Sequence, residues 1–149
     1  MDRNSRPPSL TDRTNEDTRA FFQERITKYL LIYGCIGLSF VVMRVGSALS
    51  VGTVAVEASQ PNFVAHAAGV AFSLGGWLMV RSGPKSVDYL EKVETAALMA
   101  SMTSYAVMGF FMPMVFSPQE TSMLALALGL FARAIYVPSS ARRSLMMAL

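Results

Sequence analysis

The chain lacks most of the residues on which catalytic and metal-binding sites depend. It contains one cysteine, Cys35, and one histidine, His66, so it has no second thiol for an intrachain disulfide and no cluster of metal ligands. Glycine-rich phosphate loops and the GxSxG, HExxH, CxxC and HRD-type motifs are also missing. We therefore expect no catalytic residue, metal site or cofactor within these 149 residues.

Charge is also scarce, at 15% of the residues against about 25% in a soluble domain. The apolar residues gather in four stretches: 29–49, 62–80, 95–116 and 118–137. Each is close to the roughly 20 residues that cross about 30 Å of hydrocarbon as a helix. None shows the alternating polarity of a barrel strand. The sequence thus predicts an all-α membrane protein with four transmembrane helices and the lipid bilayer as its partner.

The lysines and arginines predict an orientation. Six precede the first stretch, three lie between the second and third, and three lie toward the end of the chain, whereas only Arg44 falls on the other side. Cytoplasmic loops carry the excess of basic residues, so both termini are expected in the cytoplasm of a bacterial inner membrane. The outer loops then lie at about 47–61 and 117–121. The net charge of +3 is explained by this topology, and no nucleic-acid partner is expected.

The chain divides into three parts on this interpretation. Residues 1–14 are polar and predicted to be a disordered cytoplasmic tail. Residues 15–143 form the transmembrane domain, which begins with an amphipathic helix at the inner surface that leads into the first span. Residues 144–149 are apolar again and resemble the opening of a fifth span. We therefore expect this chain to be the front part of a larger protein.

Turn and capping residues predict the ends of the helices. An irregular outer loop is expected at 52–61, between a glycine and a proline. Gly83 is suited to the end of the second helix and Ser86 to the N-cap of the third. Pro113 should kink or end the third helix near the outer face. A capping box with proline at the first helical position predicts that the fourth helix starts at Pro118.

Small residues recur at helical spacing in two of the predicted spans. They are Ala65, Gly69 and Ser73 in the second span, and Ala125 and Gly129 in the fourth. Such stripes let helix backbones approach closely in a membrane. They are interpreted as intramolecular packing surfaces, with a homodimer through the same faces as the alternative.

Three polar residues fall toward the predicted outer side, namely Arg44, Glu57 and His66. Unpaired charges inside a bilayer are costly and rare, so these residues could form one outer polar cluster that binds a ligand or responds to pH. Alternatively, Arg44 simply extends to the interface, because it lies near the end of its span.

Three arginines lie toward the predicted inner side, and they are Arg133, Arg142 and Arg143. They are expected to anchor the chain near anionic lipid headgroups.

Three stretches carry a family resemblance: residues 20–26 (AFFQERI), His66-Ala67-Ala68 with Trp77, and residues 133–144 (RAIYVPSSARRS). Over about residues 18–149 the chain resembles the N-terminal membrane region of serine/threonine protein kinases from myxobacteria and related bacteria. The resemblance implies that the last stretch is a hinge before two further spans and a cytoplasmic kinase domain. None of the family's catalytic residues can be carried over, because that domain is not within these residues.

Three functions stay open at this level. The first is a sensory or anchoring membrane domain of a signalling protein, whose gene continues past Leu149 into a catalytic domain. The second is a self-contained small membrane protein that acts in assembly or interaction, with a stop codon at or just after Leu149. The third is a small transporter or channel subunit, which requires a polar, water-accessible path through the bundle.

Overall fold

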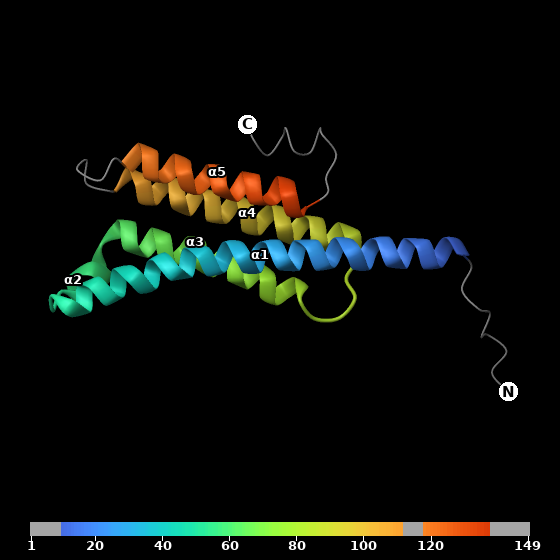
Figure 1. Ribbon diagram of the computed structural model, residues 1–149, viewed down its shortest axis with the longest axis horizontal. Coiled ribbons are helices and arrows are strands. Elements are labelled where there is room, and N and C mark those ends of the chain that lie inside the picture. The colour runs from blue at the N-terminus through green and yellow to red at the C-terminus, as the bar shows by residue number, and fades with distance from the viewer. Residues whose placement is uncertain (1–9, 112–117, 138–149) are drawn as a thin grey trace.

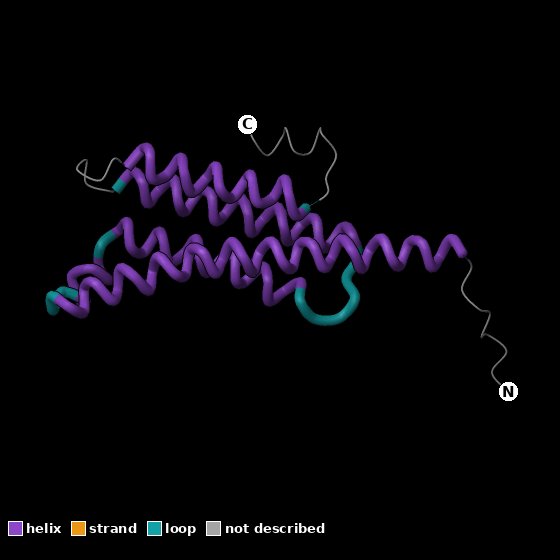
Figure 2. The backbone as a smooth tube through the Cα atoms, viewed as in Figure 1, coloured by secondary structure: helices purple, strands orange, loops and turns teal. Residues whose placement is uncertain are grey.

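The computed structural model describes residues 10–111 and 118–137, and within these ranges the elements are helices joined by short turns, with no strand (Figures 1 and 2). The order along the chain is α1 (Leu10–Ser50), α2 (Val54–Ser59), α3 (Pro61–Val80), α4 (Val87–Phe110) and α5 (Pro118–Tyr136). The prediction of an all-α protein is confirmed at this level.

Within the part of the chain that the structure describes, two helices are long and apolar enough to cross a membrane, namely the part of α1 over Asn15–Ser50 and α3. The apolar part of α5, Met123–Tyr136, is shorter, and α4 carries four charged residues in its first half. The structure therefore favours a membrane protein on length and composition. The number of spans and the orientation stay predictions.

Helix α1 differs from the prediction at its beginning. It starts at Leu10, so residues 10–14 are helical rather than a disordered tail, and it continues unbroken for 41 residues. The expected interfacial helix is not a separate element, because Ile26 and Tyr29 are fully buried in the core and the helix runs on into the first predicted span. No glycine or proline interrupts residues 10–33, so nothing in the sequence breaks the helix there. The first turns of α1 extend beyond the ends of the other helices (Figure 1).

The bundle is organised around α3, which packs against both α1 and α4, while α5 lies along α4 and α1 (Figure 1). Glycine allows the closest approaches. A Cβ atom on Gly76 of α3 would lie 2.7 Å from Ala97 Cβ of α4, and one on Gly34 of α1 would clash with the Leu74 side chain. An added side chain at Gly76 would require α4 to move, and one at Gly34 would require the Leu74 side chain to move, so glycine allows the close approach at both positions.

The helix ends agree with several of the capping predictions. Ser86 caps α4 by accepting a hydrogen bond from the Tyr89 N–H at 3.2 Å, and α5 starts at Pro118. Gly83 adopts a positive φ of 65°, although α3 itself ends three residues earlier, at Val80.

Two predictions about the outer connections have different outcomes. The expected irregular loop over 52–61 instead contains a helix, α2. Residues 54–59, VAVEAS, lack glycine and proline and can therefore be helical. Helix α4 ends at Phe110, and Pro113 lies outside the described residues. Arg142, Arg143 and the predicted fifth span at 144–149 also lie outside them.

Candidate functional site

The predicted outer polar residues are partly brought together. Arg44 of α1 donates from Nε to Glu57 Oε1 at 2.7 Å, and its Nη2 donates to the same carboxylate. The guanidinium also donates to Asn62 Oδ1 at 3.3 Å and lies 5.2 Å from the centroid of the Phe63 ring. These contacts join α1, α2 and the first turn of α3 into one polar cluster, which we call the outer cluster. Asn62, which sequence reasoning missed, is 8% exposed and completes it.

His66 lies one helical turn deeper on α3 than Asn62, and it is buried. Its imidazole packs edge-on against the ring of Tyr105 on α4, with centroids 5.6 Å apart, and it lies beside the backbone of Gly37 on α1. The side chain thus forms the inner neighbour of the outer cluster and contacts two further helices.

A series of aromatic rings continues inward from His66. The ring of Tyr105 meets that of Tyr33 edge-to-face at 5.9 Å, and Tyr33 stacks on Tyr29 at 5.9 Å with an interplanar angle of 9°. We call these four residues, His66, Tyr105, Tyr33 and Tyr29, the aromatic column. At its inner end the hydroxyl of Tyr29 donates to the carbonyl of Gly129 on α5 at 3.4 Å. The column therefore connects α1, α3, α4 and α5.

The glycines of the predicted small-residue stripes pack against this column. A Cβ atom on Gly129 would lie 2.8 Å from the Tyr33 hydroxyl, and one on Gly69 would lie 3.1 Å from the Tyr105 ring. A third glycine, Gly37, faces the Tyr105 hydroxyl, at 2.6 Å from where its Cβ would stand. These residues therefore pack within the chain, which is the intramolecular interpretation of the stripes.

The other members of the stripes also face neighbouring helices of the same chain. The hydroxyl of Ser73 lies 2.8 Å from that of Ser101 on α4, and both hydroxyls reach the Gly69 carbonyl, at 3.2 and 3.0 Å. Ala65 and Ala125 are partly buried against the core. Polar side chains in a membrane bundle commonly bond across helices in this way.

The structure places Arg133 differently from the prediction. It was expected to reach lipid headgroups at the inner interface, but it is 3% exposed and its Nε donates to Glu94 Oε1 of α4 at 2.5 Å. Arg133 lies one turn after Gly129 on the face of α5 that packs inward, so it meets a carboxylate before it meets lipid. Tyr29, at the inner end of the aromatic column, bonds the carbonyl of Gly129, which lies one turn before Arg133 on α5.

Sequence reasoning missed Glu94, which is 0% exposed, because it stands one residue before the predicted third span. A signal for it does exist. Glu94 falls in a buried series at helical spacing that also contains Leu90, Ala97, Leu98, Ser101 and Tyr105. A carboxylate on an otherwise apolar helix face predicts a basic partner on a neighbouring helix.

Gln23 is a second residue that the sequence did not single out. Its Nε2 donates to the carbonyls of Val80 and Gly83 at 2.8 and 2.7 Å, and its Oε1 accepts from the Lys85 N–H at 3.2 Å. The amide therefore joins α1 to the connection between α3 and α4. Nothing in the surrounding sequence distinguishes it, because it is one of several polar and charged residues in the first turns of α1.

Basic and aromatic side chains pair beside this connection. The guanidinium of Arg81 lies 4.7 Å from the centroid of the Trp77 ring, and the Lys85 ammonium lies 5.5 Å from that of Tyr89. Such pairs are typical of a membrane–water boundary, where aromatic rings and cations both concentrate.

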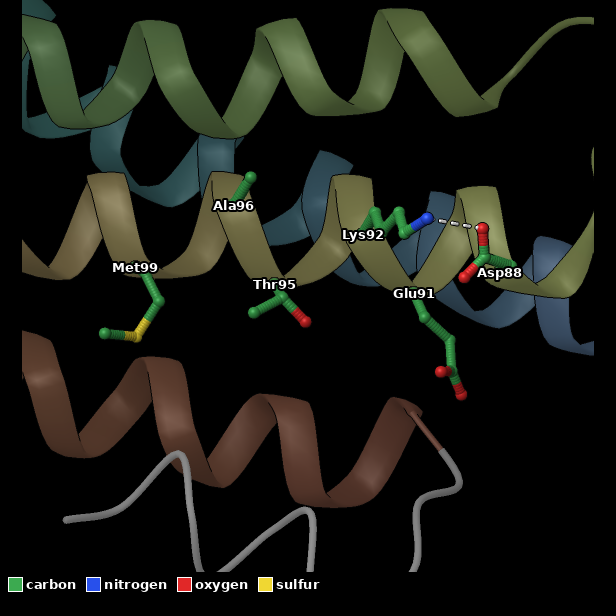
Figure 3. Close-up of a pocket in the computed structure, with 6 residues that line it drawn as sticks. All are labelled: Asp88, Glu91, Lys92, Thr95, Ala96 and Met99. Carbon is green, nitrogen blue, oxygen red and sulfur yellow. Dashed lines mark hydrogen bonds and ion pairs between the residues drawn. The ribbon is translucent and has the colours of Figure 1, made fainter.

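A shallow hollow runs along α4 and is lined by Asp88, Glu91, Lys92, Thr95, Ala96 and Met99 (Figure 3). Figure 3 shows that all six side chains come from this one helix and that Lys92 and Asp88 pair with each other, at 2.7 Å. A hollow with a single wall does not enclose a ligand, so we assign no site to it.

The chain matches no family model, no curated protein and no solved structure. Among residues 15–111 and 123–137, no three histidine, cysteine or carboxylate side chains are grouped to hold a metal ion. What the protein does is therefore inferred from two ionic contacts at different depths of the bundle and from the rings between them.

Proposed function

We propose that this chain is a membrane-anchoring and sensory domain of a bacterial signalling protein, inserted in the inner membrane through four helices with both ends in the cytoplasm. The observation that carries the proposal is the buried Glu94–Arg133 ion pair at one end of the aromatic column, with the outer cluster near the other end. Buried ion pairs add little stability compared with apolar residues of the same volume. Ionisable residues inside a membrane bundle are therefore expected to serve function.

The ion pairs also support the passage of α4 and α5 through the bilayer. Helix α5 has 19 residues and is about 28 Å long, close to the thickness of the hydrocarbon core. Helix α4 carries Glu94, but the contact with Arg133 offsets this charge inside the bundle. The pairing of Arg81 with Trp77 and of Lys85 with Tyr89 supports an inner boundary near the α3–α4 connection.

The packing of the rings favours sensing over conduction. Tyr105 and Tyr33 fill the spaces at Gly37, Gly69 and Gly129, where any added Cβ would be within about 3 Å of a ring atom or hydroxyl oxygen of one of these tyrosines. A water-filled path at this level would require these helices to separate. A packed column of rings that contacts four helices can instead transmit a shift of the rings at one end to the helices at the other end. Such a column can switch between two packing arrangements.

The family resemblance adds a specific form of the proposal. The signalling protein would be a transmembrane serine/threonine kinase whose chain continues through two further spans into a cytoplasmic catalytic domain. Reading the gene beyond codon 149 tests this form directly. We expect two apolar stretches followed by kinase motifs, whereas a stop codon at or just after Leu149 would favour a self-contained membrane assembly protein.

The sensory role is tested in the full-length protein, reconstituted in vesicles, by the rate of autophosphorylation. We expect His66→Leu to change this rate or its response to pH, because the imidazole links the outer cluster to the aromatic column. Glu24→Gln is the control, since Glu24 is exposed and pairs only locally with Lys28. Equal rates and equal pH responses for the wild type and both variants would count against sensing through the column.

A further inference from the structure

The connection between α1 and α3, residues 51–60, has an unusual distribution of charge. We call it the outer connection. Glu57 is the one acidic or basic residue between Arg44 and Arg81, apart from His66. It belongs to α2, a helix in which no residue is buried. Exposed apolar side chains precede it along the chain, with Leu49 exposed by 65%, Val51 by 70% and Val56 by 59%.

Helix α2 turns its charge inward and its apolar side chains outward. The Glu57 side chain is only 28% exposed and is bound by Arg44, which is 26% exposed. A short surface helix in water shows the opposite arrangement, with its apolar face on the protein and its charge in solvent. The observed arrangement fits an apolar environment, where an unpaired carboxylate is costly and an exposed valine is not.

Five polar groups at the ends of α1 and α2 are bonded within the chain. The N–H groups of Gly52, Thr53 and Gln60 donate to backbone carbonyls at 3.3, 2.9 and 3.1 Å. The hydroxyls of Ser50 and Ser59 donate to carbonyls three residues earlier, at 2.7 and 2.8 Å. A loop in water can leave such groups to solvent, whereas in hydrocarbon they must find partners inside the protein.

From these three observations we infer that α2 is embedded in the outer leaflet of the membrane, with the side chains of Val51 and Val56 against lipid acyl chains. The Arg44–Glu57 contact holds it there by removing the charge from the lipid-facing side. Leu49 of α1 and Val64 of α3, which flank the connection along the chain, are also exposed, by 65% and 55%. The inference rests on the proposed membrane insertion and adds that the outer connection is a lipid-contacting element rather than a loop in water.

The test uses spin labels on the full-length protein in vesicles of phosphatidylethanolamine and phosphatidylglycerol. Cys35 is first replaced by alanine so that a single introduced cysteine carries the label. Val56→Cys reports on α2, Leu78→Cys reports on the exposed face of α3, and Ser82→Cys reports on the exposed α3–α4 connection. For each, the collision rates with oxygen, which concentrates in lipid, and with a water-soluble nickel complex are compared.

We expect oxygen to collide more often than nickel at Val56 and at Leu78, and the reverse at Ser82. Preferred nickel collisions at Val56, with Leu78 still in lipid, would overturn the placement of α2 and leave the membrane proposal standing. Low rates with both reagents at Val56 would mean that a protein covers the surface, and this outcome also overturns the inference. Preferred nickel collisions at Leu78 would instead refute the membrane insertion itself.

The role of the ion pair is tested in the same assay. Arg44→Met leaves the Glu57 carboxylate unpaired, so the label at Val56 should move toward nickel accessibility as α2 leaves the lipid. Adding Glu57→Gln removes the remaining charge and should return the label to oxygen preference. Circular dichroism confirms that each variant is folded, and an unchanged label in Arg44→Met would show that the pair does not hold α2.

Discussion

The contact between Glu94 and Arg133 leads to a quantitative prediction, because both side chains are almost completely buried. Two opposite charges about 4 Å apart attract by about 4 kcal/mol at an effective dielectric constant of about 20. Burying each ion costs several kcal/mol, so the intact pair adds little compared with apolar residues. Removing one partner leaves a buried charge, and we expect Glu94→Leu or Arg133→Met to lower the free energy of unfolding by roughly 3–5 kcal/mol.

The double variant separates this electrostatic effect from a loss of packing. When Glu94→Leu and Arg133→Met are combined, no buried charge is left, and the two apolar side chains occupy a similar volume. The free energy of unfolding should then lie within about 1–2 kcal/mol of the wild type, or above it. The coupling energy from the complete cycle should be at least about 3 kcal/mol.

The free energy of unfolding is measured on the protein in bicelles, either by steric trapping or by titration with a denaturing detergent. Lys92→Met is the matched control, because Lys92 and Asp88 also form an ion pair, at 2.7 Å, but their side chains are 75% and 76% exposed. We expect this control to change stability by less than about 1 kcal/mol. The reasoning is refuted if Glu94→Leu costs no more than the control, or if the double variant loses as much as both single variants together.

Three further predictions follow from other contacts. Gly129→Ala should lower the free energy of unfolding by about 1–3 kcal/mol, because its Cβ would lie 2.8 Å from the Tyr33 hydroxyl. Gly75→Ala, whose Cβ would meet no atom within 4 Å, should be neutral or stabilising. Equal effects of the two variants in the unfolding assay would contradict this packing. Gln23→Ala removes three hydrogen bonds to the α3–α4 connection and should speed tryptic cleavage at Arg81 and Lys85, and an unchanged cleavage rate would show that the amide does not hold this turn. A reporter fused after Gln119 should behave as external to the cytoplasm, and cytoplasmic activity would refute the four-span topology.

The local boundaries of the helices could be predicted with some success. Ser86 caps α4 and Pro118 opens α5, because a capping side chain and a fixed proline φ act over one turn of the chain. The start of α1 was misplaced, since residues 10–14, four of which are polar, resemble a tail in composition but extend a helix that the bundle already stabilises. The helix α2 was missed because its six residues, five apolar or small ones and Glu57, are too few to show a clear periodicity.

The candidate site was predicted less completely. Arg44 and Glu57 were grouped from their expected depth in the membrane, and the structure brings them into contact. Glu94 was missed, and Arg133 was assigned to the interface rather than to the interior. The rotation of α5 about its axis decides this second point, and that rotation depends on which residues of α1 and α4 it meets.

By itself, the sequence determines an all-helical chain with at least two helices able to cross a membrane, because apolar length and local capping are properties of contiguous residues. Only the tertiary structure decides that Arg133 meets Glu94, that Tyr105 and Tyr33 lie on glycines of other helices, and that α2 turns Glu57 inward. These contacts join residues that are 13 to 96 positions apart. Their geometry follows from the rotation and close approach of whole helices, which no local pattern specifies.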